Sequence, residues 1–258
     1  MLRFKTTNLI FVGAFVLLLL ASFFFTVSLS VFLLLFVLWI IITAFGSFQI
    51  QWNYHVKSLH SNIAISKNEV AITFDDGPNP EYTLRVLSLL KQYNAKATFF
   101  CVGKNIASHP EIFKQILAEG HTVGNHTYSH SNGFGFFSTQ KVIEDLQQTN
   151  AIAKKVANLE LKLYRPAFGV TNPNIKKALQ VTKLQSIGWN KRSFDTTKLS
   201  EEKIVKRVTK DLKKGDIILL HDSSEKTSKV LEQLLLFLQT KQMQSVPVDQ
   251  LLAIEAYA

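Results

Sequence analysis

The chain has 258 residues with 29 basic and 19 acidic side chains, giving a formal net charge of +10. This balance suits an anionic surface such as lipid headgroups, although a lysine-rich solvated surface explains it equally well. The lysines are scattered and no Arg-rich run occurs, which argues against nucleic acid as a partner. The single cysteine, Cys101, excludes an intramolecular disulfide and lies in an apolar run that predicts a buried strand.

The N-terminal part of the chain is almost wholly apolar. No charged residue occurs from Asn8 to Ile50, and only Arg3 and Lys5 precede this stretch. A helix over residues 9–48 would reach roughly 60 Å, about twice the ~30 Å hydrocarbon core of a bilayer. We therefore predict a membrane anchor over residues 1–50 with two spans, near 9–26 and 30–48. The alternative, a cleaved signal peptide, has an apolar region of only about 7–15 residues.

The orientation of this anchor depends on the number of spans. Arg3 and Lys5 favour an N-terminus on the inner side of the membrane. Two spans return the chain to that side, and Lys57 and Lys67 after the second span agree weakly with this placement. A single span would place the rest of the chain outside, so the sequence leaves the side open.

After the anchor, residues 51–66 are predicted as a linker and residues 67–258 as one domain. β-rich runs end at turn signals and alternate with segments of helical spacing. The expected strands are 70–74, 97–102, 121–124, 161–164, 184–189 and 216–220, and the expected helices are 82–93, 110–119, 140–158, 174–180, 201–213 and 228–240. This alternation predicts an α/β fold of parallel strands joined by crossover helices.

Polar side chains follow most of the expected strands. They are Asp75 with Asp76, His126 with His130, Arg165, Asp195 and His221. Sites in parallel barrels and open α/β sheets gather at the carboxyl ends of strands. We therefore expect these groups to meet in one cleft.

The pair His126 and His130 is a candidate for metal binding. On a helical turn, the i, i+4 spacing would place both imidazoles on one face, about 5–6 Å apart. Asp76 can add an oxygen ligand, and two histidines with one carboxylate leave coordination positions open, as in catalytic zinc sites. A His-x-x-x-His pair alone is more often two surface histidines, and Asp75-Asp76-Gly77-Pro78 alone favours a plain turn.

Three further residues are candidates for proton transfer and orientation. His221 can act as a general acid, because its ordinary pKa of ~6.5 suits proton transfer near neutrality. Arg165 can orient a carboxylate through its planar fork. Asp195 can pair with Arg165 or with His221. The ordinary alternatives are a helix-capping segment after His221, a surface ion pair for Arg165 and a turn cap for Asp195.

The order of these motifs resembles that of the polysaccharide deacetylase family, carbohydrate esterase family 4, also called the NodB-homology domain. The resemblance covers about residues 67–258. It rests on residues 73–78 (TFDDGP), 126–130 (HTYSH), 165–169 (RPAFG), Trp189 with Asp195, and 219–222 (LLHD). The first two motifs are highly specific. The third departs from the family at Ala167 and Phe168, where proline and tyrosine are common, and the fourth is the loosest.

The resemblance implies a distorted, incomplete (β/α) barrel and a set of roles. Asp76, His126 and His130 would hold one divalent metal ion, with Zn²⁺ expected and Co²⁺, Ni²⁺ or Mn²⁺ as alternatives. For catalysis, it implies Asp75 as general base, His221 as general acid, Arg165 as the residue that orients the base, Asp195 as a partner of this network, Phe168 as an N–H donor to the oxyanion and Trp189 as a wall of the cleft.

The implied activity is removal of an N-acyl group, N-acetyl above all, from a carbohydrate. The carbohydrate partner would be a cell-wall or exported glycan if the domain lies outside, or a lipid-linked sugar at the inner leaflet of a bacterial cytoplasmic membrane if it lies inside. A non-catalytic glycan-binding membrane protein is the alternative from another class. The sequence does not give the oligomeric state.

Overall fold

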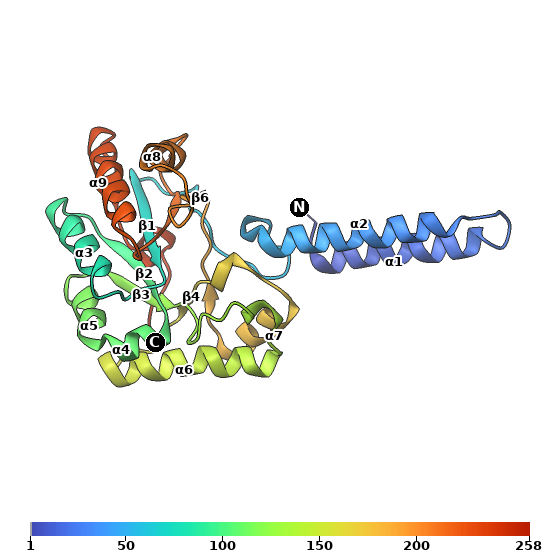
Figure 1. Ribbon diagram of the computed structural model, residues 1–258, viewed down its shortest axis with the longest axis horizontal. Coiled ribbons are helices and arrows are strands. Elements are labelled where there is room, and N and C mark those ends of the chain that lie inside the picture. The colour runs from blue at the N-terminus through green and yellow to red at the C-terminus, as the bar shows by residue number, and fades with distance from the viewer. Residues whose placement is uncertain (1) are drawn as a thin grey trace.

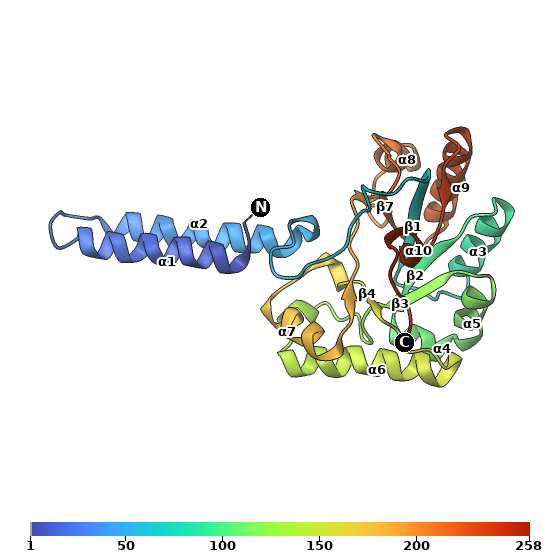
Figure 2. The ribbon, with the colours of Figure 1, turned by 180° about the vertical axis from the view of Figure 1, so that it is seen from behind.

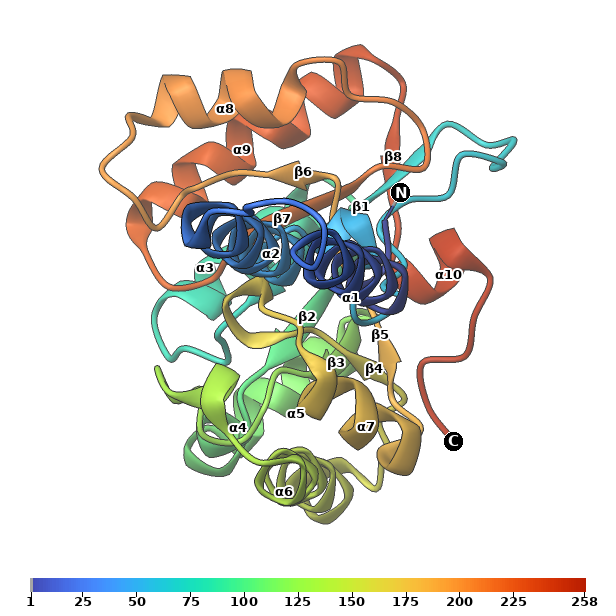
Figure 3. The ribbon, with the colours of Figure 1, turned by 90° about the vertical axis from the view of Figure 1, so that its right-hand side faces the viewer.

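The computed structural model describes residues 2–258 and has two parts (Figure 1). A long pair of antiparallel helices projects from an α/β domain, and the same arrangement is seen from behind in Figure 2. Figure 3 looks along the projecting pair and shows it in front of the sheet, with α6 and α7 on one side and α8 and α9 on the other.

The projecting helices are α1 (Phe4–Ala21) and α2 (Leu29–Phe48). Both are long and apolar enough to cross a membrane, as judged by length and composition alone. The first helix differs from the expected span 9–26, because it starts at residue 4 and ends before the three phenylalanines at 23–25. Ser22 is the C-cap of this helix, and its hydroxyl donates to the Leu19 carbonyl at 2.6 Å. Ser28 is the N-cap of the second helix. Within the pair, the indole N–H of Trp39 donates to Asn8 at 2.9 Å.

The domain is a curled parallel half-barrel of the expected (β/α) type. Its strands are β1 (Glu69–Asp75), β2 (Ala97–Cys101), β3 (Thr122–Asn125), β4 (Leu163–Tyr164), β5 (Gln185–Ser186), β6 (Lys191–Arg192), β7 (Ile217–His221) and β8 (Gln244–Ser245). They follow the order β5-β4-β3-β2-β1-β7-β6, and β8 pairs with the start of β1. Every residue of β1 is buried, as expected for the central strand of a parallel sheet covered on both faces.

Helices surround this sheet, with α3, α5, α8 and α9 packed on one face and α10 on the other. They are α3 (Tyr82–Gln92), α4 (Gly103–Ser108), α5 (Pro110–Ala118), α6 (Thr139–Ala157), α7 (Pro173–Thr182), α8 (Glu201–Thr209), α9 (Glu225–Thr240) and α10 (Val248–Leu252), with short 3₁₀ turns η1 (Ile50–Trp52), η2 (Phe134–Phe136) and η3 (Ala167–Gly169). The helix expected at 201–213 ends four residues early, since Lys210 is extended and Asp211 has a left-handed backbone. The strand expected at 184–189 is only two residues long.

Residues 50–62, here called the closing segment, lie between β5 and the start of β7. The backbone N–H of Leu59 donates to the carbonyl of Ser186, the last residue of β5, and the N–H of Asn62 donates to the carbonyl of Gly215 before β7. Ile50 is buried in the same apolar cluster as Trp189. Most of the stretch predicted as a linker therefore packs on the domain and extends across the open side of the half-barrel.

Candidate active site

Strand register places the first two reactive groups side by side. Asp75 is the last residue of β1, His221 is the last residue of β7, and the two are register partners across the parallel pair. On the next strands, Cys101 of β2 pairs with Asn125 of β3, and Asn125 pairs with Tyr164 of β4. The residues that follow these strand ends therefore enter the same region, as expected for a parallel sheet.

Asp76, His126 and His130 form the one cluster of at least three His, Cys, Asp or Glu groups in residues 2–258 that can hold a metal. One ligand atom from each lies within 4.8 Å of the others. The Asp76 Oδ1 atom is 3.5 Å from Nε2 of His126 and 3.3 Å from Nε2 of His130.

The backbone that joins the two histidines differs from the expected helical turn. Residues 126–130 form an irregular loop, in which Thr127 (φ 66°) and His130 (φ 43°) are left-handed. The ring centroids of His126 and His130 are nonetheless 4.9 Å apart. The pairing of the side chains was predicted correctly, and the helical geometry was wrong.

The chemistry of this cluster fits a divalent metal. His126 donates from Nδ1 to the carbonyl of Arg165 at 2.9 Å, which leaves Nε2 directed at Asp76 as a ligand. Burial alone would raise the pKa of Asp76, but the hydrogen bond and charge of His126 hold that pKa well below its usual range. Burial lowers the pKa of His130, aided by the charge of His126. An ionised carboxylate and a neutral imidazole are the forms that ligate a metal. Burial would lower the pKa of His126, but the charges of Asp75 and Asp76 raise it, so a cation bound here would displace the proton from its Nε2.

Arg165 is fully buried beside Asp75. Its Nη1 atom lies 3.2 Å from Asp75 Oδ1, and its Nε donates to the Ile187 carbonyl at 2.8 Å. The guanidinium carbon stands 4.3 Å from the centroid of the Phe100 ring. These contacts fix the guanidinium group of Arg165, which holds Oδ1 of Asp75. The other carboxylate oxygen, Oδ2, lies 3.9 Å from Nε2 of His126.

His221 pairs with Asp195, which decides between the two partners expected for that aspartate. The His221 Nδ1 atom is 2.7 Å from Asp195 Oδ1, and Asp195 Oδ2 accepts the backbone N–H of His221 at 2.8 Å. Burial opposes the charged imidazole, but the hydrogen bond and charge of Asp195 raise the pKa of His221 to about 9. The imidazole is therefore protonated at neutral pH with its Nε2 free of this pair, as a proton donor must be.

Phe168 and Trp189 lie on either side of Gly169. Phe168 has φ 57°, and its ring centroid is 4.6 Å from that of His130. Its backbone N–H makes no hydrogen bond within residues 2–258, so it is available to a ligand. Trp189 is only 5% exposed and packs against Gly169, with the guanidinium of Arg165 5.2 Å from its ring centroid.

Comparison with known proteins gives the family. The family model described as polysaccharide deacetylase matches residues 63–187. A peptidoglycan-N-acetylglucosamine deacetylase of Bacillus cereus is 39% identical over 170 residues, covering 64% of this chain and 78% of the relative. The chain belongs to the polysaccharide deacetylase family. A chitooligosaccharide deacetylase of Bradyrhizobium is 30% identical over 196 residues, covering 70% of this chain and 90% of the relative.

Solved deacetylase structures confirm the fold. Peptidoglycan deacetylase PdaC of Bacillus subtilis superposes with a TM-score of 0.69 at 30% identity, covering 73% of this chain and 91% of that structure. The chain spans only 43% of the full-length relative of that name. A family pseudoenzyme of Bacillus anthracis shares the fold at 24% identity, with a TM-score of 0.68 and coverage of 75% and 68%. The deacetylase fold therefore does not by itself establish catalysis.

One residue that supports the deacetylase site was missed by sequence reasoning. Asp145 on α6 is buried, and its carboxylate accepts the backbone N–H groups of Tyr128 at 2.6 Å and Ser129 at 3.3 Å. These two residues lie between the paired histidines, so Asp145 holds the left-handed loop in place. The available signal was a carboxylate on the same helical face as Val142 and Leu146.

Asp222, the residue after His221, was also assigned no site role. It is 1% exposed and accepts a hydrogen bond from Thr83. Burial raises the pKa of Asp222 to about 7. It packs against Gly77, directly after the two aspartates, where an added Cβ would collide with its carboxylate. Asp222 therefore supports the turn that carries Asp76.

The phenylalanines after the paired histidines are divided between two environments. Phe134 is buried in a cluster with Val142 and Leu146, whereas Phe136 is 94% exposed. Phe134 is therefore part of the core. Phe136 can contact only what approaches from outside.

Proposed function

We propose that this chain is a metal-dependent deacetylase that removes N-acetyl groups from amino sugars of a glycan and is held at a membrane by α1 and α2. The observation that carries the proposal is the placement of Asp75 and His221 as register partners beside the Asp76, His126 and His130 cluster. Relatives named as deacetylases of peptidoglycan and chitooligosaccharides support a carbohydrate amide as substrate.

The proposed reaction starts with water attacking the amide carbonyl. A divalent metal held by Asp76, His126 and His130 would polarise the carbonyl and make a bound water more acidic. Asp75 accepts the proton of the attacking water, and Arg165 holds the carboxylate in the orientation for this transfer. The carbonyl oxygen becomes negatively charged, and the free N–H of Phe168 is the protein donor assigned to it.

The second half of the reaction breaks the carbon–nitrogen bond. His221 donates its Nε2 proton to the amine nitrogen as that bond breaks, because an unprotonated amine leaves poorly. Asp195 keeps the imidazole oriented and protonated until this transfer. The products are acetate and a free amino sugar. Asp75 then loses its proton to solvent and His221 regains one from solvent, which returns the site to its starting state.

The test is an acetate-release assay with Asp75→Asn. The substitution keeps the size of the side chain and removes the base, so turnover should fall by roughly 10²–10⁴-fold. Metal content of the purified protein should stay at the wild-type level, since Asp75 is not among the three ligands. Asp211→Asn, an exposed aspartate on a left-handed turn, is the matched control and should keep full activity. Near-normal turnover in Asp75→Asn would refute the base assignment.

A second candidate substrate is an acylated sugar carried on a lipid at the inner leaflet. It is favoured by the two-helix hairpin, which returns the chain to the side of Arg3 and Lys5. A reporter fused after Ala258 separates the candidates. An inside C-terminus favours the lipid-linked sugar, and an outside C-terminus favours peptidoglycan or an exported glycan.

The third candidate is a non-catalytic glycan-binding protein, as the fold of the family pseudoenzyme illustrates. All residues required by the proposed reaction are present in this chain, which argues against it. Glycan binding without acetate release over a series of divalent metals would establish it in place of the deacetylase.

A further inference from the structure

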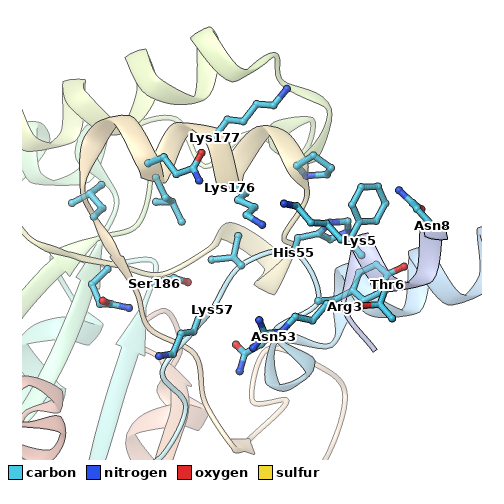
Figure 4. A pocket seen from close by; sticks show the side chains of 18 residues that line it. Arg3, Lys5, Thr6, Asn8, Asn53, His55, Lys57, Lys176, Lys177 and Ser186 are labelled. Carbon is cyan, nitrogen blue, oxygen red and sulfur yellow. The ribbon is translucent and has the colours of Figure 1, made fainter. Parts of the chain in front are cut away.

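A large pocket lies where the helical hairpin joins the domain, away from the proposed catalytic residues. Its volume is about 990 Å³, and its walls come from the first turns of α1, residues 53–57 of the closing segment, α7 and β5 (Figure 4). The hydrogen bond from the Phe4 N–H to the Tyr54 carbonyl, at 3.1 Å, fixes the first turn of α1 against the closing segment. The pocket is therefore a built feature of the junction.

The charge of this pocket is of one sign. Five cationic side chains line it and no aspartate or glutamate does: Arg3, Lys5, Lys57, Lys176 and Lys177. None of the five forms an ion pair within the part of the chain that the structure describes. Lys5 and Lys176 extend toward the same space from opposite walls, as Figure 4 shows. Like charges that line one pocket repel each other, and an anion between them would relieve that repulsion.

The place of the pocket relative to the hairpin indicates which kind of anion would bind there. The two helices of 18 and 20 residues span about 27–30 Å, the thickness of the hydrocarbon core. With the hairpin in a bilayer, the first turn of α1 lies at the level of the lipid headgroups. Apolar side chains such as Phe4 and Leu179 share the walls with the lysines, as suits a molecule with an anionic head and an apolar body.

From the unpaired cations and their position, we propose that this pocket binds the phosphate-bearing headgroup of an anionic phospholipid. The ammonium groups of Lys5 and Lys176 would contact the phosphate from two sides, and Arg3 and Lys57 would contact further oxygens. The shared chemistry is a phosphate anion, and the position at the membrane surface favours the lipid over free phosphate as its source. The inference rests on the membrane anchoring proposed above and does not depend on the deacetylase reaction.

The test uses the full chain in zwitterionic detergent micelles. Unfolding temperature, followed by tryptophan fluorescence, is measured while short-chain phosphatidylglycerol, phosphatidylcholine or inorganic phosphate is added. A ligand that binds the folded state raises the unfolding temperature with its concentration. Each lysine near an anionic headgroup contributes roughly a five-fold change in affinity, so Lys5→Ala/Lys176→Ala should need roughly ten- to thirty-fold more phosphatidylglycerol.

The control variant is Lys154→Ala/Lys155→Ala, which removes the same charge from the end of α6 farthest from the hairpin (Figure 1). It should respond to phosphatidylglycerol like the wild type. An unchanged response in Lys5→Ala/Lys176→Ala, or equal stabilisation by phosphatidylcholine, overturns the proposal. Full stabilisation by inorganic phosphate at the same concentration overturns the lipid assignment. The unfolding temperatures without ligand show that both variants fold.

A separate measurement tests the anchoring. Carbonate washing of membranes should leave the wild-type chain in the pellet, whereas release would refute anchoring by the hairpin. The micelle titration needs neither a bilayer nor catalytic turnover, so its failure is distinguishable from failure of the anchor or of the deacetylase activity.

Discussion

Replacing Asp195 by asparagine should change the pH dependence of the reaction more than its maximum rate. Asp195 is fully buried and raises the pKa of His221 to about 9 through a 2.7 Å hydrogen bond. Asparagine keeps the shape and loses the charge. Burial then opposes the remaining charges of Asp75 and Asp76, so the pKa of His221 should fall toward its ordinary value of 6.5. The fraction of protonated His221 at pH 8 then drops from roughly 90% to roughly 3%, a loss of about thirty-fold in kcat/KM.

The same calculation predicts only a small loss in kcat/KM for Asp195→Asn at acidic pH. At pH 6 both forms of the enzyme keep most of His221 protonated, and the protonation loss is less than about two-fold. The assay is acetate release as a function of pH for the wild type and Asp195→Asn, with the unfolding temperature of each recorded. A variant whose profile keeps the wild-type alkaline limb, merely scaled down, would show that Asp195 acts on folding or geometry and not on the proton of His221.

Three further outcomes follow from the structure. His126→Ala should lose the bound metal, readable by elemental analysis of the purified protein, and full metal content would remove His126 from the ligand set. Burial lowers the pKa of His121 to about 4, so the unfolded state takes up a proton first as pH falls, and the free energy of unfolding should drop by roughly 1.4 kcal/mol per pH unit between pH 6.5 and 4. His121→Gln should flatten that slope in chemical denaturation, and an unchanged slope would contradict the assignment. Gly215→Ala adds a methyl group at φ +84° against the Asn62 backbone and should cost about 2 kcal/mol of stability, whereas Gly13→Ala, with no atom within 4 Å, should cost none.

Several features of the site were accessible from the sequence because they follow from strand periodicity. Asp75 and His221 end apolar β-rich runs, and parallel register necessarily brings such ends together. The closeness of His126 and His130 was predicted from their spacing, although the helical turn assumed for it is absent. The left-handed backbone between them could not be predicted. It depends on Asp145, which is distant in sequence and does not affect the local backbone propensity of residues 126–130.

The regions that sequence patterns describe poorly are those stabilised by distant contacts. β5 and β6 have two residues each, too short to show alternation. The closing segment is held by backbone hydrogen bonds to Ser186 and Gly215, which lie far along the chain. The first helix was placed five residues too late, because Thr6, Thr7 and Asn8 are polar and their fit depends on neighbours such as Trp39. The division of the chain at residues 50 and 66 stays a prediction.

The carbonyl of Ser47, near the end of α2, accepts a hydrogen bond from the backbone N–H of Thr171, and this contact limits how far the domain can move from the hairpin. Ile50, which follows α2, is buried in the domain, so no flexible linker separates the hairpin from the catalytic domain. With the hairpin in a bilayer, the reaction centre stays at one height above the lipid surface. A polymeric glycan would then be modified only in the thin layer adjoining the membrane, and its outer strands would keep their acetyl groups.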